Sequence, residues 1–387
     1  MCPAIAPKLV EEAQRWRHEI HRHPELAFEE FRTAEFISQK LSSFGLKVET
    51  GIGKTGVVGF LERGSKTIAL RCDMDALPVQ EENKLPYKSQ VEGKMHACGH
   101  DGHTAILLAA AKHLSQIKDL AVNVLFIFQP AEEKESGALA MLADGLLEKY
   151  PCEAIFALHN WPGLEVGKVA VKRGAMMASS DVFTINLEGR GTHAAMPHLG
   201  DDLVLMASQL ILALETLVLR KLTPGEPALI SICSLSTSSD AYNVLPQRVT
   251  LKGTCRAFSA KTREFLEKEI KRQTLDFARA QQIRAEVSYT RYYPPTINDP
   301  EWASYVAQCA TELFGKENVL QDFLPSFGAE DFSFFLEKLP GAYFWLGNGS
   351  TSPLHSPNYD FNDELLAYGI ALWEKIVLNF PKYVRAV

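Results

Sequence analysis

The chain has 387 residues, of which 46% are hydrophobic and 22% are charged, a composition typical of globular proteins and a length sufficient for two domains. The net charge of -7 and the sequence pI of about 5.9 argue against a nucleic-acid partner or a polybasic membrane contact. Seven scattered cysteines do not make a disulfide framework, and nothing reads as a signal peptide or membrane span, so we expect a reduced, cytoplasmic setting without a membrane partner.

The first part of the chain alternates helical and buried-strand patterns. Helical spacing of apolar residues ends at His23-Pro24, and a Gln-Pro-Ala turn follows the second strand. The predicted order is helix 9–22, strand 67–75, helix 104–114, strand 121–128, helix 137–150 and strand 153–158. Because these strands are apolar throughout and alternate with helices, we predict an α/β fold with a mostly parallel sheet and helices on both faces.

The middle third has a different pattern, because its strands alternate apolar and polar residues. The predicted order is strand 181–189, helix 202–220, strands 228–235 and 247–258, helix 261–280 and strand 283–290. This order predicts an α+β sandwich with one solvated sheet face. Continuously apolar segments, like those in the first part of the chain, then follow as helix 300–314, strand 342–348 and helix 364–378. We therefore predict a discontinuous domain, 1–178 plus 293–387, with a smaller domain, 179–292, inserted in it.

Polar residues follow several of the buried strands. They are Asp73 and Asp75 after the first strand, Glu132 and Glu133 after the second, His159 after the third and His355 beyond the strand 342–348. The stretch HACGHDGH, residues 96–103, lies in a loop that enters a helix. Since ligand sites of open α/β sheets lie at the carboxyl ends of the strands, we expect these groups to converge.

The residue types of this set suit a divalent metal ion. Thiolate, imidazole and carboxylate ligands would come from Cys98, His100, Glu133, His159 and His355. They fit zinc, and Mn, Co or Ni would tolerate them as well. Five ligands exceed what one tetrahedral site needs, so two ions that share a bridging ligand are expected. The adjacent Glu132 could then act as general base.

Each residue also has a plainer interpretation. His96 and His103 could equally be loop or helix-cap residues, the two glutamates could form a solvated face, and His21 falls in a helical segment and reads as ordinary. A redox or nucleophilic Cys98 partnered by His100 would leave Glu132, Glu133, His159 and His355 unexplained. A non-catalytic metal- or peptide-binding protein would be expected to lack one of these residues, and none is missing.

The sequence resembles a known family over essentially its whole length. It is similar to the peptidase M20 family, in the amidohydrolase branch that includes hippurate hydrolases, N-acyl-amino-acid deacylases and plant auxin–amino-acid conjugate hydrolases. The motifs, in chain order, are HRHPELAFEE (21–30), LRCDMDALPVQE (70–81), HACGHDGHTA (96–105), FQPAEE (128–133), GRGTHAAMPH (189–198), YNVLPQ (242–247), FGAEDFSFF (327–335) and LHSPNYDFND (354–363).

The resemblance implies a di-metal amidase that hydrolyses N-acyl-L-amino acids, with a dipeptidase or carboxypeptidase as the alternative. It implies metal ligation by Cys98, His100, Glu133, His159 and His355, with Glu132 as general base. The inserted lid would supply His193 to the oxyanion, and Asn243 and Arg256 to the substrate carboxylate, which arginine can clamp with two hydrogen bonds. A surface ion pair is the plainer role for Arg256.

The same resemblance implies a small-molecule partner and a homodimer or homotetramer formed through the lid. One departure concerns Arg71, which stands where many relatives in the wider family carry a metal-binding histidine. That leaves Asp73 and Asp75 as supporting or structural groups rather than ligands. The acyl group and the amino acid released stay open, because residue spacing does not define pocket walls.

Overall fold

The computed structural model describes residues 5–383 of the chain, which divide into two compact units. The first comprises the described chain up to Met176, Ile297–Leu324 and the residues from Asp331 on, and the second comprises Met177–Thr296 and Pro325–Glu330. Residues 325–330, which the sequence assigned to the larger domain, group with the smaller unit. Backbone hydrogen bonds explain this grouping, because the N–H of Ala178 donates to the carbonyl oxygens of Ser326 at 3.0 Å and of Gly328 at 2.9 Å.

The larger unit is built on an eight-stranded sheet. Its strands are β1 (Lys47–Ile52), β2 (Gly56–Leu61), β3 (Thr67–Asp73), β4 (Asn123–Gln129), β5 (Ala154–Pro162), β6 (Val169–Ala170), β15 (Val319–Leu320) and β16 (Gly341–Gly349). The order is β1-β2-β4-β3-β5-β16-β6-β15. The central neighbours β4, β3, β5 and β16 run parallel, whereas β1 and β2 add antiparallel strands at one edge. A mostly parallel sheet is thus confirmed, although the sequence did not predict the strands at its two edges.

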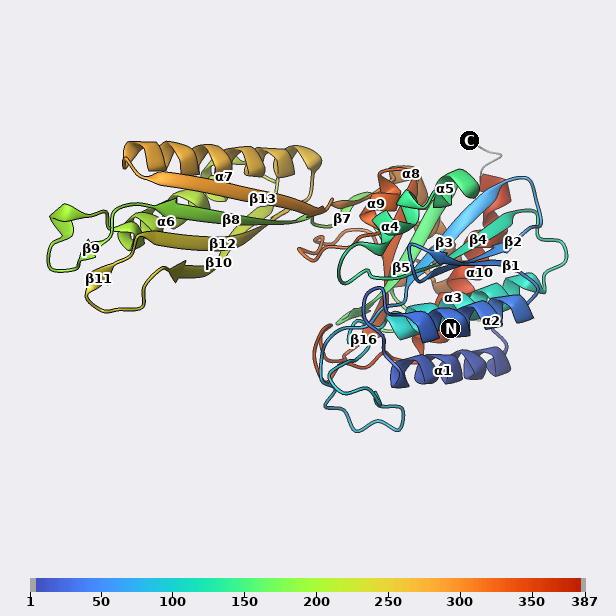
Figure 1. The fold of residues 1–387 in the computed structure, drawn as a ribbon. Coiled ribbons are helices and arrows are strands. Elements are labelled where there is room, and N and C mark those ends of the chain that lie inside the picture. The colour runs from blue at the N-terminus through green and yellow to red at the C-terminus, as the bar shows by residue number, and fades with distance from the viewer. Residues whose placement is uncertain (1–4, 384–387) are drawn as a thin grey trace. The chain divides into compact units, whose positions relative to one another are not determined.

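Helices surround this sheet. They are α1 (Pro7–Arg22), α2 (Phe31–Ser43), α3 (His100–Ser115), α4 (Gly137–Ala143), α5 (Leu146–Lys149), α8 (Pro300–Phe314), α9 (Ser333–Leu336) and α10 (Leu365–Tyr383), with a 3-10 turn at Lys316–Asn318. Figure 1 shows α1, α2 and α3 on one side of the sheet and α4 and α5 on the other. The single helix predicted for 137–150 is two helices, because Gly145 adopts a left-handed φ of 78° between them.

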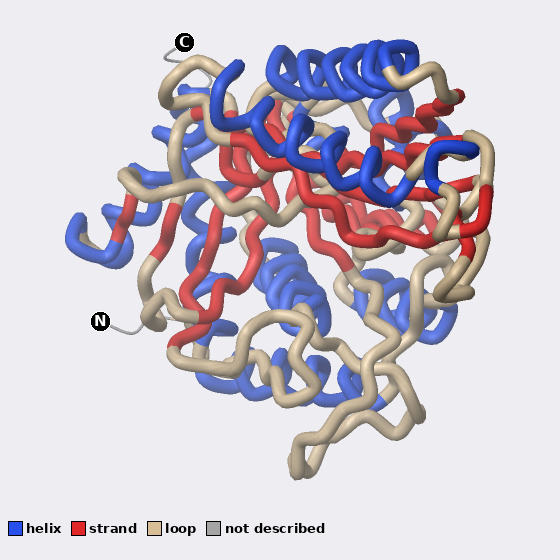
Figure 2. Tube along the Cα trace, turned by 90° about the vertical axis from the view of Figure 1, so that its left-hand side faces the viewer, coloured by secondary structure: helices blue, strands red, loops and turns tan. Residues whose placement is uncertain are grey.

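Helix α3 is apolar almost all round, and its buried residues include His100, Asp101 and His103. A helix of this kind belongs in a core rather than on a surface. It begins at His100, four residues earlier than predicted, after Gly99 with a φ of 90°. The preceding connection, residues 74–99, has no helix and no extended strand, and it forms the tan loop at the bottom of Figure 2. Connections of this length are uncommon and usually functional.

The smaller unit is an antiparallel sheet with two helices. Its strands are β8 (Ser180–Glu188), β10 (Ala228–Thr237), β12 (Arg248–Ala257) and β13 (Arg284–Tyr293), and its helices are α6 (Leu203–Lys221) and α7 (Ala260–Ala280). The sheet order is β10-β12-β8-β13. Residues of β8 and β12 alternate between buried and partly exposed, because only one face packs on the helices. Both helices contact the sheet and each other.

Short elements complete the fold. Strands β9 (Thr192–His193) and β11 (Val244–Leu245) pair with each other, as do β7 (Gly174–Met177) and β14 (Thr296–Asn298), and a 3-10 turn spans Pro197–Leu199. By length and composition alone, α6 is apolar enough to cross a membrane, a test that core helices of soluble proteins also pass. Its buried residues, such as Leu210 and Leu214, belong to the core of the smaller unit.

Candidate metal centre

The predicted ligand residues of the larger unit lie at the carboxyl ends of its central strands. β3 ends at Asp73 and β4 at Gln129, so Glu132 and Glu133 follow within one turn. His159 lies inside β5, in register with Trp345 of β16, and not beyond the strand as the sequence suggested. Because these strands are parallel, their carboxyl ends share one edge of the sheet. Cys98 and His100 reach the same edge from the start of α3.

The five predicted ligands form one continuous cluster. Sγ of Cys98 lies 3.5 Å from Nε2 of His159. Oε1 of Glu133 lies 3.9 Å from Nε2 of His100 and 3.3 Å from Nε2 of His355. Ligand atoms of Cys98, Glu133 and His355 all lie within 4.8 Å of one another. Four segments distant in sequence therefore meet at a spacing that a bound ion could bridge.

Hydrogen bonds at the opposite ring nitrogen orient two of these histidines. Nδ1 of His100 lies 2.9 Å from the carbonyl oxygen of Asp75, and Nδ1 of His159 lies 2.7 Å from the carbonyl oxygen of Asn160. Each ring donates through Nδ1, which leaves Nε2 as the nitrogen that a metal ion would bind in place of a proton. Nε2 of His100 is buried and has no hydrogen-bond partner among residues 5–383. Such an atom is costly unless something binds it, so the donor set fits a divalent ion.

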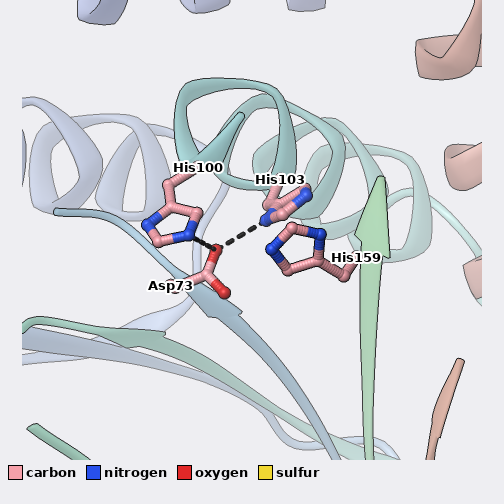
Figure 3. Close-up of side chains that lie close together, drawn as sticks. All are labelled: Asp73, His100, His103 and His159. Atoms are coloured by element: carbon pink, nitrogen blue, oxygen red, sulfur yellow. Dashed lines mark hydrogen bonds and ion pairs between the residues drawn. The ribbon is translucent and has the colours of Figure 1, made fainter. Parts of the chain in front are cut away.

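A second set of close side chains is shown in Figure 3, namely Asp73, His100, His103 and His159. Nδ1 of His103 lies 2.6 Å from Oδ1 of Asp73, and Nε2 of His103 accepts the N–H of Asn160 at 2.9 Å. Both ring nitrogens of His103 are thereby used. Oδ2 of Asp73 accepts from Nη1 of Arg71 at 2.9 Å. Asp73 and His103 are consequently placed to support the neighbouring ligand residues rather than to bind an ion themselves.

The cluster has a strongly negative electrostatic environment. Burial alone would lower the pKa of His100, but the carboxylates of Asp73, Asp75 and Glu133 raise that pKa to about 10. Burial and the nearby charges of Glu133 and Glu132 raise the pKa of the Cys98 thiol well above its usual value. A thiol in such surroundings is not a thiolate at neutral pH without a cation. This environment disfavours Cys98 as a free nucleophile and favours cation binding.

Glu132 is buried beside these groups, with a carboxylate oxygen within 4.8 Å of ligand atoms of His100 and Glu133. The preceding Ala131 has a φ of 53°, which is left-handed and unusual for a residue with a Cβ. Its N–H donates to Oε1 of Glu30 at 2.9 Å, and the hydroxyl of Thr55 donates to Oε2 of Glu30 at 2.6 Å. Glu30 therefore stabilises the turn that presents Glu132.

His355 has the same kind of backbone, with a φ of 66°. Its side chain is 54% exposed, unlike those of the other four predicted ligands. The N–H of His355 donates to the carbonyl oxygen of Ala97 at 2.8 Å, which holds the His355 loop next to Cys98. Strain that is retained by surrounding hydrogen bonds is common at functional sites.

The three remaining predicted residues lie in the smaller unit. His193 is on β9, opposite Val244 of β11, and is exposed. Together with Asn243, Thr192 and Gln247 it lines an open pocket of about 440 Å³. Arg256 is half-buried near the end of β12, and burial lowers its pKa. Eight residues of strand separate Arg248 from Arg256, which amounts to about 26 Å. Asn243 and β11 directly precede Arg248 in the chain, and His193 pairs with Val244 of β11. Arg256 is therefore at the opposite end of β12 from His193 and Asn243.

Several buried residues of the metal centre were missed from the sequence. They are Glu30, Asn160 and Tyr359. The sequence also did not predict the contacts of Arg71, whose Nη2 donates to Oδ1 of Asp331 at 3.0 Å. The only sequence signal for Glu30 and Tyr359 was their position within family-like motifs. Asn160 next to His159 gave no separate signal, because one asparagine in an apolar strand has many roles.

Comparison with known proteins is consistent with this geometry. The sequence pattern of the peptidase family M20/M25/M40 matches residues 69–379. The hippurate hydrolase of Campylobacter jejuni is 43% identical over 374 residues, covering 96% of this chain and 97% of that protein. The IAA-amino acid hydrolase ILR1-like 4 of Arabidopsis thaliana is 38% identical over 381 residues, covering 96% of this chain and 86% of that protein.

A solved structure gives the same result. The YXEP protein of Bacillus subtilis, described as a dinuclear metal binding peptidase from the M20 family, superposes with a TM-score of 0.85 at 32% identity, covering 97% of this chain and 99% of that one. The family pattern spans most of the chain, and the relatives match nearly all of it. The chain belongs to peptidase family M20/M25/M40.

Proposed function

We propose that this protein is a metal-dependent amidohydrolase that cleaves the amide bond of N-acyl-L-amino acids. The observation that carries the proposal is the convergence of five side chains of the types that ligate metal ions, with a buried carboxylate beside them. The ligands are Cys98, His100, Glu133, His159 and His355, and the carboxylate is Glu132. Relatives named hippurate hydrolase and N-acetyl-L-cysteine deacetylase support the substrate class.

The chemistry divides between the ions and the protein. Two divalent ions of the Zn, Mn, Co or Ni type, held by the five proposed ligands, would lower the pKa of the attacking water and polarise the scissile carbonyl. Glu132 takes the proton of the attacking water and returns it to the leaving amine, as a general base that becomes a general acid. His193 donates a hydrogen bond to the oxyanion of the tetrahedral intermediate. Arg256 and Asn243 bind the carboxylate of the amino-acid half.

We also propose that the smaller unit is a lid through which two copies of the chain associate. β10 is an edge strand of its sheet, and α6, which contacts β10, exposes Leu205, Leu212 and Leu219. These leucines are seven residues apart and lie on one stripe of the helix. Apolar stripes beside free strand edges are typical association surfaces. A second copy of the chain would cover both in a symmetric homodimer.

The separation of Arg256 from His193 supports the same association. Arg256 lies about 26 Å along β12 from Arg248, and His193 pairs with Val244 of β11, which precedes Arg248 in the chain. One small substrate cannot contact both residues of a single lid. In a homodimer, the lid of one copy can supply Arg256 to a substrate, and the lid of the other copy can supply His193 and Asn243 to the same substrate. A tetramer would need a further surface.

The six described cysteines are all free, which supports a reducing, cytoplasmic setting.

A substrate panel tests the proposed function. The purified protein is dialysed against a chelator and assayed with N-acetyl, N-benzoyl, N-indole-acetyl and long-chain N-acyl amino acids, with and without each divalent ion. We expect no hydrolysis after chelation and recovery with added ions. Hydrolysis that survives complete metal removal would contradict the metal mechanism. Cleavage of dipeptides but of no N-acyl amino acid would favour the peptidase alternative instead.

A further inference from the structure

Asn160 uses every hydrogen-bonding group of its buried side chain. Nδ2 lies 2.6 Å from the carbonyl oxygen of Cys98 and 3.0 Å from Nε2 of His103, and Oδ1 accepts from the hydroxyl of Tyr359 at 2.6 Å. The amide orientation follows from these partners, because a carbonyl and a lone-pair nitrogen require donors, whereas a hydroxyl can donate. Asn160 and Tyr359 are both fully buried.

Glycine at position 99 leaves the space that the side chain of Asn160 needs to reach the carbonyl oxygen of Cys98. A Cβ at this position would stand 2.3 Å from Nδ2 of Asn160 and 2.5 Å from the hydroxyl oxygen of Tyr359. Gly99 also has a φ of 90°, which glycine adopts without strain. Position 99 lies between two predicted ligands, Cys98 and His100. It thus has to be glycine if the side-chain amide of Asn160 is to reach the carbonyl oxygen of Cys98.

These contacts join three of the four ligand-bearing segments. Asn160 follows His159 directly on β5, and its amide holds the peptide of Cys98. Tyr359 lies in the loop of His355 and donates to that same amide, while its own N–H donates to Ser356 at 3.0 Å. The distances between Cys98, His159 and His355 therefore depend on two side chains that bind no ion.

We propose that Asn160 and Tyr359 are positioning residues that set the metal affinity of the centre by fixing the spacing of Cys98, His159 and His355. This inference rests on the proposed function, because it presupposes that these residues bind a metal. Both side chains are fully buried, so neither is exposed to a substrate. Residues that orient ligands in this way typically change metal affinity by about 10-fold to 100-fold when they are replaced.

Tyr359→Phe is the primary test, because it removes one hydroxyl and keeps the ring. The dissociation constants for Zn²⁺ and Co²⁺ are measured by competition with a chelator, and we expect both to rise by about tenfold. The thiolate-to-cobalt charge-transfer band of the Co²⁺ form should shift or weaken, since it reports the bond to Cys98. Tyr305→Phe is the matched control, because Tyr305 is an equally buried tyrosine whose hydroxyl donates to Ile376.

Asn160→Asp is a second, nearly isosteric variant. It replaces the donor to Cys98 with an acceptor, and we expect a loss of metal affinity of roughly 100-fold. Unchanged metal affinity and spectrum in a folded Tyr359→Phe protein would overturn the inference, as would an equal loss of affinity in Tyr305→Phe. A wild-type protein that binds no divalent ion would instead overturn the proposed function itself.

Discussion

The main-chain N–H of Glu133 donates a 3.0 Å hydrogen bond to Oδ2 of Asp75. Oδ1 of the same carboxylate lies 3.3 Å from Nδ1 of His100. One side chain therefore orients two of the proposed ligands, one through its ring and one through its backbone. Sequence alone left the role of Asp75 open, and this geometry makes it a supporting group.

Asp75→Asn should accordingly weaken metal binding without removing a ligand. The ring of His100 keeps the main-chain carbonyl oxygen of residue 75 as a partner. An amide can accept only through one oxygen, so either that ring loses its additional contact with the side chain or the N–H of Glu133 loses its acceptor. We expect metal affinity to fall by about 10-fold to 100-fold, measured by chelator competition. Asp119→Asn, at an exposed turn, is the control and should bind metal as wild type does.

Glu132→Gln should separate catalysis from metal binding. Glutamine keeps the shape of the side chain but cannot take a proton, so kcat should fall by roughly 10²-fold to 10⁴-fold. Metal content, measured by elemental analysis, should stay at the wild-type level. Glu135→Gln is a control in the same turn, since Glu135 is exposed. A fully active Glu132→Gln enzyme would end the assignment of the general base.

Much of the fold could be predicted because the apolar patterns are long and regular. The central strands β3, β4, β5 and β16 are buried along almost their whole length, and such runs are recognisable in a sequence. The edge strand β1 was missed because a half-exposed strand has a weaker pattern. Its neighbour β2 is buried, but two glycines, Gly56 and Gly59, interrupt its apolar pattern. The start of α3 was placed too late, since His100 and Asp101 are polar residues that burial and hydrogen bonds retain inside the helix.

The convergence of the proposed ligands was predictable for a different reason, which is that these thiol, imidazole and carboxylate groups follow buried parallel strands or lie within motifs that resemble those of the family. Its supporting residues were not predictable, because their role depends on contacts between distant segments. Arg71 illustrates this, since its guanidinium contacts both Asp73 and Asp331. Asp331 is 260 positions away from Arg71 in the sequence. No spacing rule connects such residues before the fold is known.

Arg71→Met should destabilise the larger unit. It would leave the carboxylates of Asp73 and Asp331 buried without their common cation, and all three side chains are fully buried. Breaking a buried ion pair on one side typically costs about 3 to 5 kcal/mol of unfolding free energy. Denaturant unfolding measures this loss. Arg190→Met, which breaks the exposed pair with Asp201, should change stability little.

Leu212→Lys should test the proposed association through the lid. Leu212 is 68% exposed on α6, so the change should not disturb the core of the smaller unit. A charge on the apolar stripe should convert the dimer to a monomer in sedimentation or light-scattering measurements. Leu275→Lys, at an exposed leucine of α7, should leave the dimer intact. Identical masses for wild type and Leu212→Lys would argue against this surface.

His21 connects stability to pH, although its sequence context appeared ordinary. Its Nδ1 lies 2.8 Å from Oδ2 of Asp101, and both side chains are fully buried. Burial lowers the pKa of His21, but the charge and hydrogen bond of Asp101 and the hydrogen bond of Glu81 outweigh it and raise the pKa to about 9. The folded protein therefore retains a proton that the unfolded chain releases near pH 6.5.

The stabilisation from His21 should consequently be complete below about pH 6.5 and lost as the pH rises through about 9. A shift of this size corresponds to about 3 kcal/mol of unfolding free energy. His21→Asn removes the titrating ring, so the stability difference between wild type and variant should shrink by that amount between pH 6 and pH 10. Denaturant unfolding at several pH values measures it. Parallel stability curves over this range would show that His21 and Asp101 do not form a charged pair in the folded protein.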